Sequence, residues 1–401
     1  MLDAVIVGAG GAGLSAALSL KKYTGSFIVI TAGNIGHSNT ARAHGGMQLP
    51  MLPEDSPELH FQDTYRGGNY KGIKELIHIL TQNTGELLHW LKTLGLEFDR
   101  HNESYIVKKC EGISVPRVLS VRGYIGSAII KVLFAEAKRN TVQIERYSIL
   151  KAISRRRDGF VLSILSQKGL IELQTKRVIL CSGGTSKQYA DSHGYGTTNQ
   201  SMSDIQFYES LKDIGITMMY EDSFQWHPTC ISLEGALYGY PVPETLRMLG
   251  AELYDGKGER IHTDGLKRDE LTEKMLNAYK KRKSVKGGDL DRENFFLDLR
   301  PALKSNKDVL DTFLFFFKKL HNYGIDPNSD YIPVCPMVHY QNGGIEINTV
   351  CETSVPGIYA AGEITGGIHG TNRLMGNSLL DVLTFGTIAG DTCGKSIETG
   401  G

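Results

Sequence analysis

The sequence lacks closely spaced cysteines. Its six cysteines are scattered through the 401-residue chain, at positions 110, 181, 230, 335, 351 and 393. Iron–sulfur clusters and structural zinc sites are usually held by thiolates in motifs such as Cys-x-x-Cys, and no such motif is present. We therefore expect no metal site in this chain.

An excess of charge of either sign is also missing, as is any long apolar run. Lysine and arginine together number 44, and so do aspartate and glutamate, which gives a formal net charge of zero. This balance gives no reason to expect nucleic acid or an anionic membrane surface as a partner. No run approaches the roughly 20 apolar residues of a spanning helix, so we expect no direct membrane insertion. The first apolar strand begins at residue 4, which leaves no room for a signal peptide and indicates a cytoplasmic protein.

The chain does contain enough apolar material for a large core. Hydrophobic residues make up 41% and charged residues 22%, which predicts a globular chain of two domains. Apolar side chains at helical spacing predict a helix over residues 72–94. Short apolar runs between polar turns predict a small β-meander over residues 142–180, and residues 178–184 read as a strand that returns to a bound cofactor.

A glycine-rich turn opens the chain between a strand and a helix. The strand is Ala4-Val-Ile-Val7, the turn is Gly8-Ala-Gly10-Gly-Ala-Gly13, and the helix continues from Leu14. At this place the first glycine permits the tight turn, the second lets the backbone approach a pyrophosphate, and the third lets the helix pack on the strand. We therefore predict dinucleotide binding. The second strand ends in Thr31 rather than an acidic ribose ligand, which argues against a simple NAD site.

A second glycine-rich region lies near the end of the chain. The apolar segment Gly357-Ile-Tyr-Ala-Ala-Gly-Glu363 leads into a loop that carries His369 and Arg373, and a helix begins within Gly376-Asn-Ser-Leu379. A helix N-terminus offers unpaired N–H groups and the positive end of a dipole, which suits the negatively charged edge of a reduced flavin. We expect His369 and Arg373 to lie where a substrate would meet that flavin.

These two regions and six further motifs occur in a fixed order along the chain. The further motifs are Ser38-Asn-Thr40 with Gly45-Gly46, Gln225-Trp-His-Pro-Thr229, Glu244-x-x-Arg247, Arg268-Asp269 and His339-Tyr-x-x-Gly-Gly344. Together they resemble the fumarate reductase/succinate dehydrogenase/L-aspartate oxidase flavoprotein family over nearly the whole chain. The layout is most similar to that of the short soluble fumarate reductases.

The resemblance implies an α/β fold, in which a Rossmann-like FAD-binding domain contains an inserted α+β capping domain. We expect residues 1–217 and 334–401 to form the discontinuous FAD-binding domain, and residues 218–333 to form the cap. The residues that match cofactor-binding positions of the family are Gly8, Gly10, Gly13, Thr31, Ser38, Asn39, Thr40, Gly45, Gly46, Gly362, Glu363, Asn377, Ser378 and Leu379.

The same resemblance assigns the substrate site. His227, His339 and Arg373 match the residues that bind two substrate carboxylates, and an arginine can hold a carboxylate with two hydrogen bonds. Arg268 matches the family's proton donor, although a free guanidinium has a pKa above about 12. Arg247 and Glu244 match the relay that resupplies the proton. The implied substrate is a small dicarboxylate, and the flavin must exchange electrons with an external partner, such as an iron–sulfur subunit.

Three departures from the family pattern bear on the cofactor and the substrate. Asn39 stands where the quinone-linked enzymes have a histidine bonded to FAD, so we expect FAD to be bound noncovalently. Pro243 replaces a threonine that touches a substrate carboxylate, and Met248 replaces a glycine. The chain also ends soon after the helix that begins near Asn377, which is why the short soluble enzymes are the better match.

Three functions remain open at this stage. The segment Glu111-Gly-Ile-Ser-Val-Pro-Arg117 resembles the soluble fumarate reductases through its Gly-x-Ser-Val-x-Arg pattern. Glu111 itself resembles the acidic residue that holds the substrate amino group in aspartate oxidases, because a carboxylate pairs with an ammonium and repels an extra carboxylate. We expect fumarate–succinate interconversion first and L-aspartate oxidation second. An FAD-bearing electron-transfer subunit of a larger complex is the third alternative, favoured by Pro243 and Met248.

Overall fold

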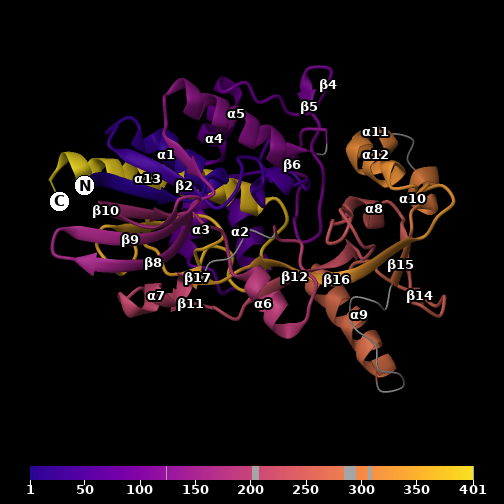
Figure 1. Ribbon diagram of the computed structural model, residues 1–401. Helices are drawn as coiled ribbons and strands as arrows, with labels where there is room; N and C mark the ends of the chain where they lie inside the picture. Colours follow the sequence, from indigo (N-terminus) through magenta and orange to yellow (C-terminus); the bar gives the residue numbers. More distant parts are fainter. Residues whose placement is uncertain (123, 201–206, 284–294, 306–308, 401) are drawn as a thin grey trace.

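The main body of the protein is built on a seven-stranded sheet (Figure 1). The computed structural model describes residues 1–122, 124–200, 207–283, 295–305 and 309–400. Parallel pairing joins β1 (Leu2–Val7), β2 (Phe27–Thr31), β7 (Ile144–Arg146), β10 (Gly169–Leu180) and β18 (Ile358–Ala360). The hairpins of β8 (Ile149–Arg156), β9 (Gly159–Ser166) and β10 extend this sheet in antiparallel fashion, as the predicted meander requires.

The central strands are apolar because both of their faces are covered. Residues 4–7 of β1 are buried, and so are residues 178–180 of β10. A near-continuous apolar run is typical of a parallel strand that is covered on both faces. The predicted α/β fold class is therefore confirmed.

Two helices from opposite ends of the chain pack closely together beside this sheet. α1 (Gly11–Leu20) follows the first glycine turn, and α13 (Asn377–Glu398) closes the chain. A Cβ atom added at Gly386 would lie 2.5 Å from the carbonyl oxygen of Ala12, and one at Gly390 would lie 2.2 Å from that of Ala16. The backbones of α1 and α13 are therefore in close contact at these two glycines of α13.

The remaining elements of the main body surround these layers. The segment predicted as one helix over residues 72–94 is two helices, because Asn83 leaves the helical conformation and its side-chain amide donates to the carbonyl of Ile79. The helices are η1 (Thr40–Arg42), α2 (Pro57–Gly67), α3 (Lys74–Gln82), α4 (Thr84–Thr93), α5 (Ile125–Arg139), α6 (Ser186–His193) and α7 (Tyr208–Asp213). The short strands are β3 (Met47–Gln48), β4 (Arg100–His101), β5 (Ser104–Tyr105), β6 (Val118–Leu119), β11 (Met218–Met219) and β17 (Gly344–Ile345).

A second body with its own hydrophobic core lies at one end of the first (Figure 1). Its antiparallel sheet has the order β12 (Phe224–Ile231), β16 (Ile332–Gln341), β15 (Phe295–Asp298), β13 (Glu252–Tyr254) and β14 (Arg260–Ile261). Its helices are α8 (Thr245–Met248), α9 (Arg268–Lys283), α10 (Arg300–Ser305), α11 (Val309–Thr312) and α12 (Leu314–Asn322). The buried residues of this core fall between positions 231 and 334. We propose that the two bodies are the FAD-binding and capping domains expected from the sequence, although β11 at residues 218–219 lies in the main body and β16 carries the second sheet to residue 341.

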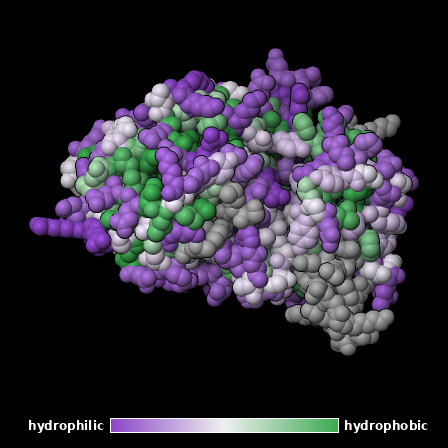
Figure 2. All heavy atoms as spheres, in the orientation of Figure 1, coloured by the Kyte–Doolittle hydropathy of each residue, from purple (hydrophilic) through white to green (hydrophobic). Residues whose placement is uncertain are grey.

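Polar side chains are spread over much of the visible surface (Figure 2). Within the described parts of the chain, no helix combines the length and the apolar character needed to cross a bilayer.

The close contact between α1 and α13 gives a test of the fold. We expect Gly390→Ala to lower the free energy of unfolding by about 1–3 kcal/mol, because its methyl group would push the two backbones apart. Gly85→Ala is a matched control, since Gly85 lies in α4 and an added Cβ there meets nothing within 4 Å. That change should instead stabilise the protein by about 0.5–1 kcal/mol. Denaturant unfolding of both variants measures the difference, and an equal response of the two would contradict the packing described.

Candidate active site

A large cavity at the carboxyl end of the main sheet, bordered by the second body, brings together most of the predicted site residues. Ligands of open α/β sheets bind outside the carboxyl ends of the strands, which is where this cavity begins. The predicted residues that line it are Gly8, Gly10, Thr31, Ser38, Asn39, Thr40, Gly45, Gly46, His227, Glu244, Arg268, His339, Gly362, Glu363, Arg373, Ser378 and Leu379. Gly13, Glu111, Arg247 and Asn377 do not line it.

The glycine turn after β1 has the shape that a dinucleotide requires. Gly8 has a φ of +108°, and an added Cβ would lie 2.2 Å from the carbonyl oxygen of Cys181. A Cβ on Gly13 would lie 1.8 Å from the carbonyl oxygen of Gly8, so this glycine serves the packing of α1 against the turn. Gly10 is different, because its nearest neighbour would be 3.6 Å away, on Ser38. The protein itself leaves room at Gly10, on the wall of the cavity, where a pyrophosphate would be expected.

The opposite wall at this end of the cavity comes from residues 38–46 and from Glu363. The Thr40 hydroxyl accepts a hydrogen bond from the backbone N–H of Gly11, 3.2 Å away, and so ties this wall to the glycine turn. The Asn39 amide contacts Asn199 and accepts from the backbone N–H of Gln200. Glu363 is buried, which raises the pKa of its carboxyl group. Glycine backbone and polar side chains thus line this wall, with Arg42 and Glu363 as its ionisable members, and they fit an extended dinucleotide.

The first turn of α13 completes this wall, with one exception to the prediction. Gly376 precedes the helix with a φ of +87°, and Ser378 and Leu379 face the cavity. Asn377 is fully buried and faces away: its side chain meets the His60 ring at 2.9 Å and donates to the Thr64 hydroxyl at 2.9 Å. Its side chain therefore fastens α13 to α2, and only its backbone belongs to the helix N-terminus predicted to hold a flavin.

At the other end of the cavity, Glu244 is held between two arginines. Arg268, the first residue of α9, donates from Nε to Oε1 at 2.6 Å and from Nη2 to Oε2 at 2.8 Å. Arg247 in α8 donates to Oε1 at 3.3 Å and to the Thr229 hydroxyl at 2.6 Å. Burial alone would raise the pKa of Glu244, but the arginines outweigh burial and hold the pKa well below its usual range. Burial likewise opposes the charge of Arg268, yet Glu244 raises the pKa of Arg268 above its usual value.

Gln225 joins this ion pair to Arg373. Its side-chain amide donates to the Asn372 side chain at 2.8 Å and to the Arg373 carbonyl at 2.7 Å. Its Oε1 must then face the two guanidinium groups, and it accepts from Arg268 at 3.2 Å and from Arg373 at 3.1 Å.

Gln225 was not predicted to contact the two arginines, although its place on the strand indicates it. Alternate residues of a strand face the same side, so Gln225, His227 and Thr229 of β12 point together. Each of the three reaches the site: Gln225 contacts Arg268, His227 lines the cavity and Thr229 contacts Arg247.

Two neutral imidazoles lie beside the arginines. The rings of His227 and His339 are 5.5 Å apart. Burial, and then the charge of Arg268, hold the pKa of both histidines well below the usual value, so both are neutral near pH 7. The Thr198 hydroxyl meets Nδ1 of His339 at 2.7 Å and fixes the orientation of that ring.

Several polar atoms at this end are buried without a partner among the described residues. They include Nε of Arg373 and Nδ1 of His227. Burial, and then repulsion by Arg268, lower the pKa of Arg373 to about 10, which leaves the guanidinium charged at neutral pH. A buried donor without an acceptor is costly, so a ligand that supplies carboxylate oxygens here would relieve that cost.

Two residues predicted near the substrate, His369 and Glu111, do not line the cavity. His369 does not face the cavity: its Nε2 meets Asp381 of α13 at 3.0 Å, and both side chains are buried. Glu111 is half-buried beside the site, where burial and then Glu244 raise the pKa of its carboxyl group. Of the two departures from the family pattern near Arg247, Pro243 lines the cavity and Met248 is exposed.

Comparisons with known proteins agree with this geometry. Residues 3–379 match the family described as the FAD binding domain. The chain is 30% identical over 394 residues to the L-aspartate oxidase of Nostoc sp., which covers 96% of this chain and 66% of that protein. It is 29% identical over 408 residues to one component of the fumarate reductase (CoM/CoB) of Methanothermobacter marburgensis, which covers 98% of this chain and 72% of that component.

The fold is similar to that of the quinol fumarate reductase FrdA of E. coli, with a TM-score of 0.85 and 25% identity, over 100% of this chain and 71% of that one. The chain spans about two thirds of the length of the Nostoc relative. The resemblance and the FAD cofactor inferred from the sequence are thereby confirmed. This chain belongs to the FAD binding domain family, and it is an FAD-dependent oxidoreductase of the fumarate reductase/succinate dehydrogenase/L-aspartate oxidase group.

Proposed function

We propose that this protein interconverts fumarate and succinate, or a closely related pair of C4 dicarboxylates. The observation that supports this most strongly is the composition of the cavity. Its glycine-lined end suits FAD, and its other end is lined by His227, His339, Arg268 and Arg373. A small anionic substrate bound at that end would lie against the cofactor.

The charge at the substrate end favours a dianion. Arg268 and Arg373 line the cavity, and Arg247 contacts Glu244 from behind it, so three arginines surround one carboxylate and leave an excess of positive charge; Arg42 also lines the cavity. Two carboxylates would balance this excess. Buried charges need such compensation, because isolated charges in a low-dielectric interior are costly.

The chain's own residues would bind and polarise the substrate. Arg373 has an Nε without a partner among the described residues, which is available for one carboxylate, and its guanidinium is fixed over the Tyr340 ring, 4.3 Å from the ring centroid. The neutral rings of His227 and His339 can each donate one hydrogen bond to the other carboxylate and so stabilise charge that develops on it. Bound FAD supplies the hydride for reduction of the alkene and takes it up in the reverse direction.

Arg268 is positioned to supply the proton. Reduction of an alkene between carboxylates needs a proton on the carbon opposite the one that receives hydride. Arg268 lines the cavity and is held by Glu244 and Gln225. Because Glu244 raises the pKa of Arg268, only a strongly basic carbanion can take its proton. Glu244 and Arg247 form a hydrogen-bonded path by which that proton would be replaced.

L-Aspartate oxidation is the second candidate, and the position of Glu111 supports it. Glu111 lies close enough to Glu244 and Arg268 for their charges to act on its carboxyl group. A carboxylate this near the site would attract a substrate ammonium group. The excess of positive charge around Arg268 and Arg373 favours a dianion over aspartate, whose ammonium group lowers its net negative charge.

The flavin must exchange electrons with an acceptor or donor outside this chain in either case. All six cysteines are buried, and burial raises the pKa of each thiol that has a resolved shift. We propose an electron-transfer partner such as an iron–sulfur subunit. The third reading, an electron-transfer subunit without substrate turnover, is less well supported, because Arg268, His339 and Arg373 all line the cavity.

The cofactor prediction concerns how FAD is held. We expect one FAD per chain that acid or heat releases, since Asn39 offers no group that could bond to the flavin. Gly8→Val should abolish FAD binding, because its side chain would collide with the backbone at Cys181. Gly10→Ala should fold normally and still lose FAD affinity, since the protein accepts a Cβ there. Flavin content and circular dichroism of each variant measure this, and flavin that stays on denatured protein would contradict it.

The substrate prediction concerns Arg373. Arg373→Lys should raise the KM for the dicarboxylate by at least about tenfold, because a lysine cannot reproduce two parallel hydrogen bonds. Arg300→Lys is the matched control, since Arg300 holds Asp298 with two hydrogen bonds in the second body and does not line the cavity. Steady-state kinetics compare the two. A KM that is unchanged in Arg373→Lys for every C4 dicarboxylate would remove Arg373 from the site.

The last prediction for this site separates the two enzymes. In a fumarate reductase, Arg268→Ala should slow fumarate reduction by about 10²- to 10⁴-fold, with reduction of the flavin by an artificial donor unchanged. Glu111→Gln should then be mild. In an aspartate oxidase, Glu111→Gln should instead cripple aspartate oxidation, because the ammonium loses its partner. Full fumarate activity in Arg268→Ala would refute the proton donor, and wild-type inactivity with every C4 substrate would favour the electron-transfer function.

A further inference from the structure

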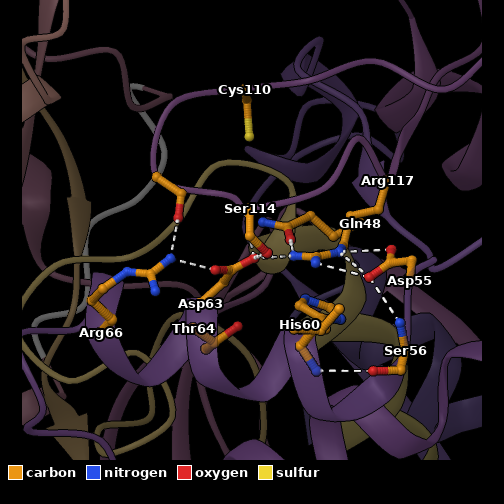
Figure 3. Close-up of polar contacts among 12 residues, drawn as sticks. Gln48, Asp55, Ser56, His60, Asp63, Thr64, Arg66, Cys110, Ser114 and Arg117 are labelled. Carbon is orange, nitrogen blue, oxygen red and sulfur yellow. Dashed lines mark hydrogen bonds and ion pairs between the residues drawn. The ribbon is translucent and has the colours of Figure 1, made fainter.

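A buried carboxylate on α2 accepts hydrogen bonds from several donors, although it does not belong to the active site described above (Figure 3). Asp63 is 1% exposed. It accepts from the backbone N–H and the hydroxyl of Ser114, each at 2.8 Å, and from Nη1 of Arg117 at 2.7 Å. Arg66 forms an ion pair with its other oxygen. These donors hold the pKa of Asp63 below its usual value although burial raises it.

The Arg117 guanidinium is completely buried and is shared between two carboxylates (Figure 3). It holds Asp55 through Nε at 2.9 Å and Nη2 at 2.9 Å, and it reaches Asp63 through Nη1. Nη1 also lies 3.4 Å from the side-chain oxygen of Gln48. The other end of that amide donates to the carbonyl of Met375 at 2.7 Å, two residues after Arg373.

This network therefore holds two loops at once. The first loop carries Glu111 and is fastened at Ser114 and Arg117. The second loop carries Arg373 and is fastened to Gln48 through Met375 and through the backbone contact of Gln48 with Gly376.

The two loops also pack on each other and on α2. Cys110, Ile113 and Val118 form a small apolar cluster with Leu374. Leu374 fits against Gly67 and Gly112, where an added Cβ would lie 2.5 and 2.8 Å from it. The residue before Arg373, Asn372, donates to the carbonyl of Gly67 at 3.2 Å. The last turn of α2 therefore packs against the residues on either side of Arg373.

The free energy of folding alone does not explain why these charged groups are buried together. The desolvation of an arginine and two aspartates costs about as much free energy as their pairing recovers. Apolar residues of similar volume often stabilise a protein equally well. Buried ionic groups do, however, fix the relative geometry of the segments that they join. Here those segments carry Arg373 and Glu111, whose positions decide which substrate is bound.

We propose that Asp63 is a positioning residue for the substrate site, acting through Arg117 and Ser114 on the loops of Arg373 and Glu111. The proposal rests on the dicarboxylate function proposed above. Within the described parts of the chain, Asp63 touches neither the cavity nor any FAD-binding residue that lines it. Its loss should therefore weaken dicarboxylate binding much more than FAD binding, which the network touches only through Met375 and Gly376.

The test uses the oxidised holoenzyme and malonate, a dicarboxylate that oxidised flavin cannot dehydrogenate because a single carbon separates its two carboxylates. Malonate affinity is followed by the change in flavin absorption, and FAD content and the thermal midpoint are measured for each variant. We expect Asp63→Asn to weaken malonate binding by about tenfold or more, since small displacements of binding groups have large effects. Asp298→Asn is the matched control: it removes a carboxylate that also holds an arginine with two hydrogen bonds, and it should lower only the thermal midpoint.

A second variant keeps the test decisive if Asp63→Asn does not fold. Arg66 is half-exposed, and its side chain joins Asp63 to the carbonyl of Gly112 in the Glu111 loop. Arg66→Ala should fold and weaken malonate binding by about two- to threefold, as the loss of an exposed pair allows. Unchanged malonate affinity in the folded variants, or a loss of FAD equal to the loss of malonate, would overturn the proposal. Failure of the wild-type protein to bind any dicarboxylate would instead overturn the proposed function.

Discussion

The site depends on one buried ion pair, between Arg268 and Glu244. Without the carboxylate, three arginines would share a space that excludes water, and their mutual repulsion would oppose folding. Glu244 neutralises one of these charges, and Gln225 separates Arg268 from Arg373 by accepting from both. Because Gln225 lies on β12 and Arg373 lies on the loop before α13, this chain of contacts also joins the two bodies. The same contacts leave charge unbalanced in the cavity, which is what an anionic substrate requires.

A different constraint shapes the cofactor end of the cavity, namely the close approach of backbone segments, which only glycine allows. Gly8 and Gly13 are glycines because backbone atoms occupy the places where their Cβ atoms would lie. Gly386 and Gly390 let α13 approach α1 closely, and the first turn of α13 faces the cavity. A long helix beginning at the cavity wall can then offer its N-terminal dipole to a negatively charged cofactor. Backbone proximity therefore prepares the FAD site, and buried charge prepares the substrate site.

The choice of substrate follows from small differences in charge around a shared fold. The relatives include an L-aspartate oxidase and a component of a fumarate reductase, with similar identity to this chain. The two reactions share two carboxylates and differ in one ammonium group. Under the function proposed above, the position of a single carboxylate, that of Glu111, would distinguish the two, and it lies on a loop that Asp63 and Arg117 hold through hydrogen bonds. Electrostatic complementarity of this kind sets specificity more than it sets affinity.

The sequence by itself determined the α/β class, the FAD family and a set of site residues, most of which line the cavity. Such features depend on local order: an apolar strand, a glycine turn and a helix form one unit whose spacing is readable, and His227, His339 and Arg373 stand inside ordered motifs. Only the tertiary structure showed that His369 faces Asp381, that the Asn377 side chain faces away from the cavity, and that Asn83 divides the helix predicted over residues 72–94. The burial of the polar face of α2 could not be predicted either, because an aspartate on a helix normally faces solvent. Burial and pairing join residues that lie far apart in the chain, so no local pattern records which polar side chains will meet.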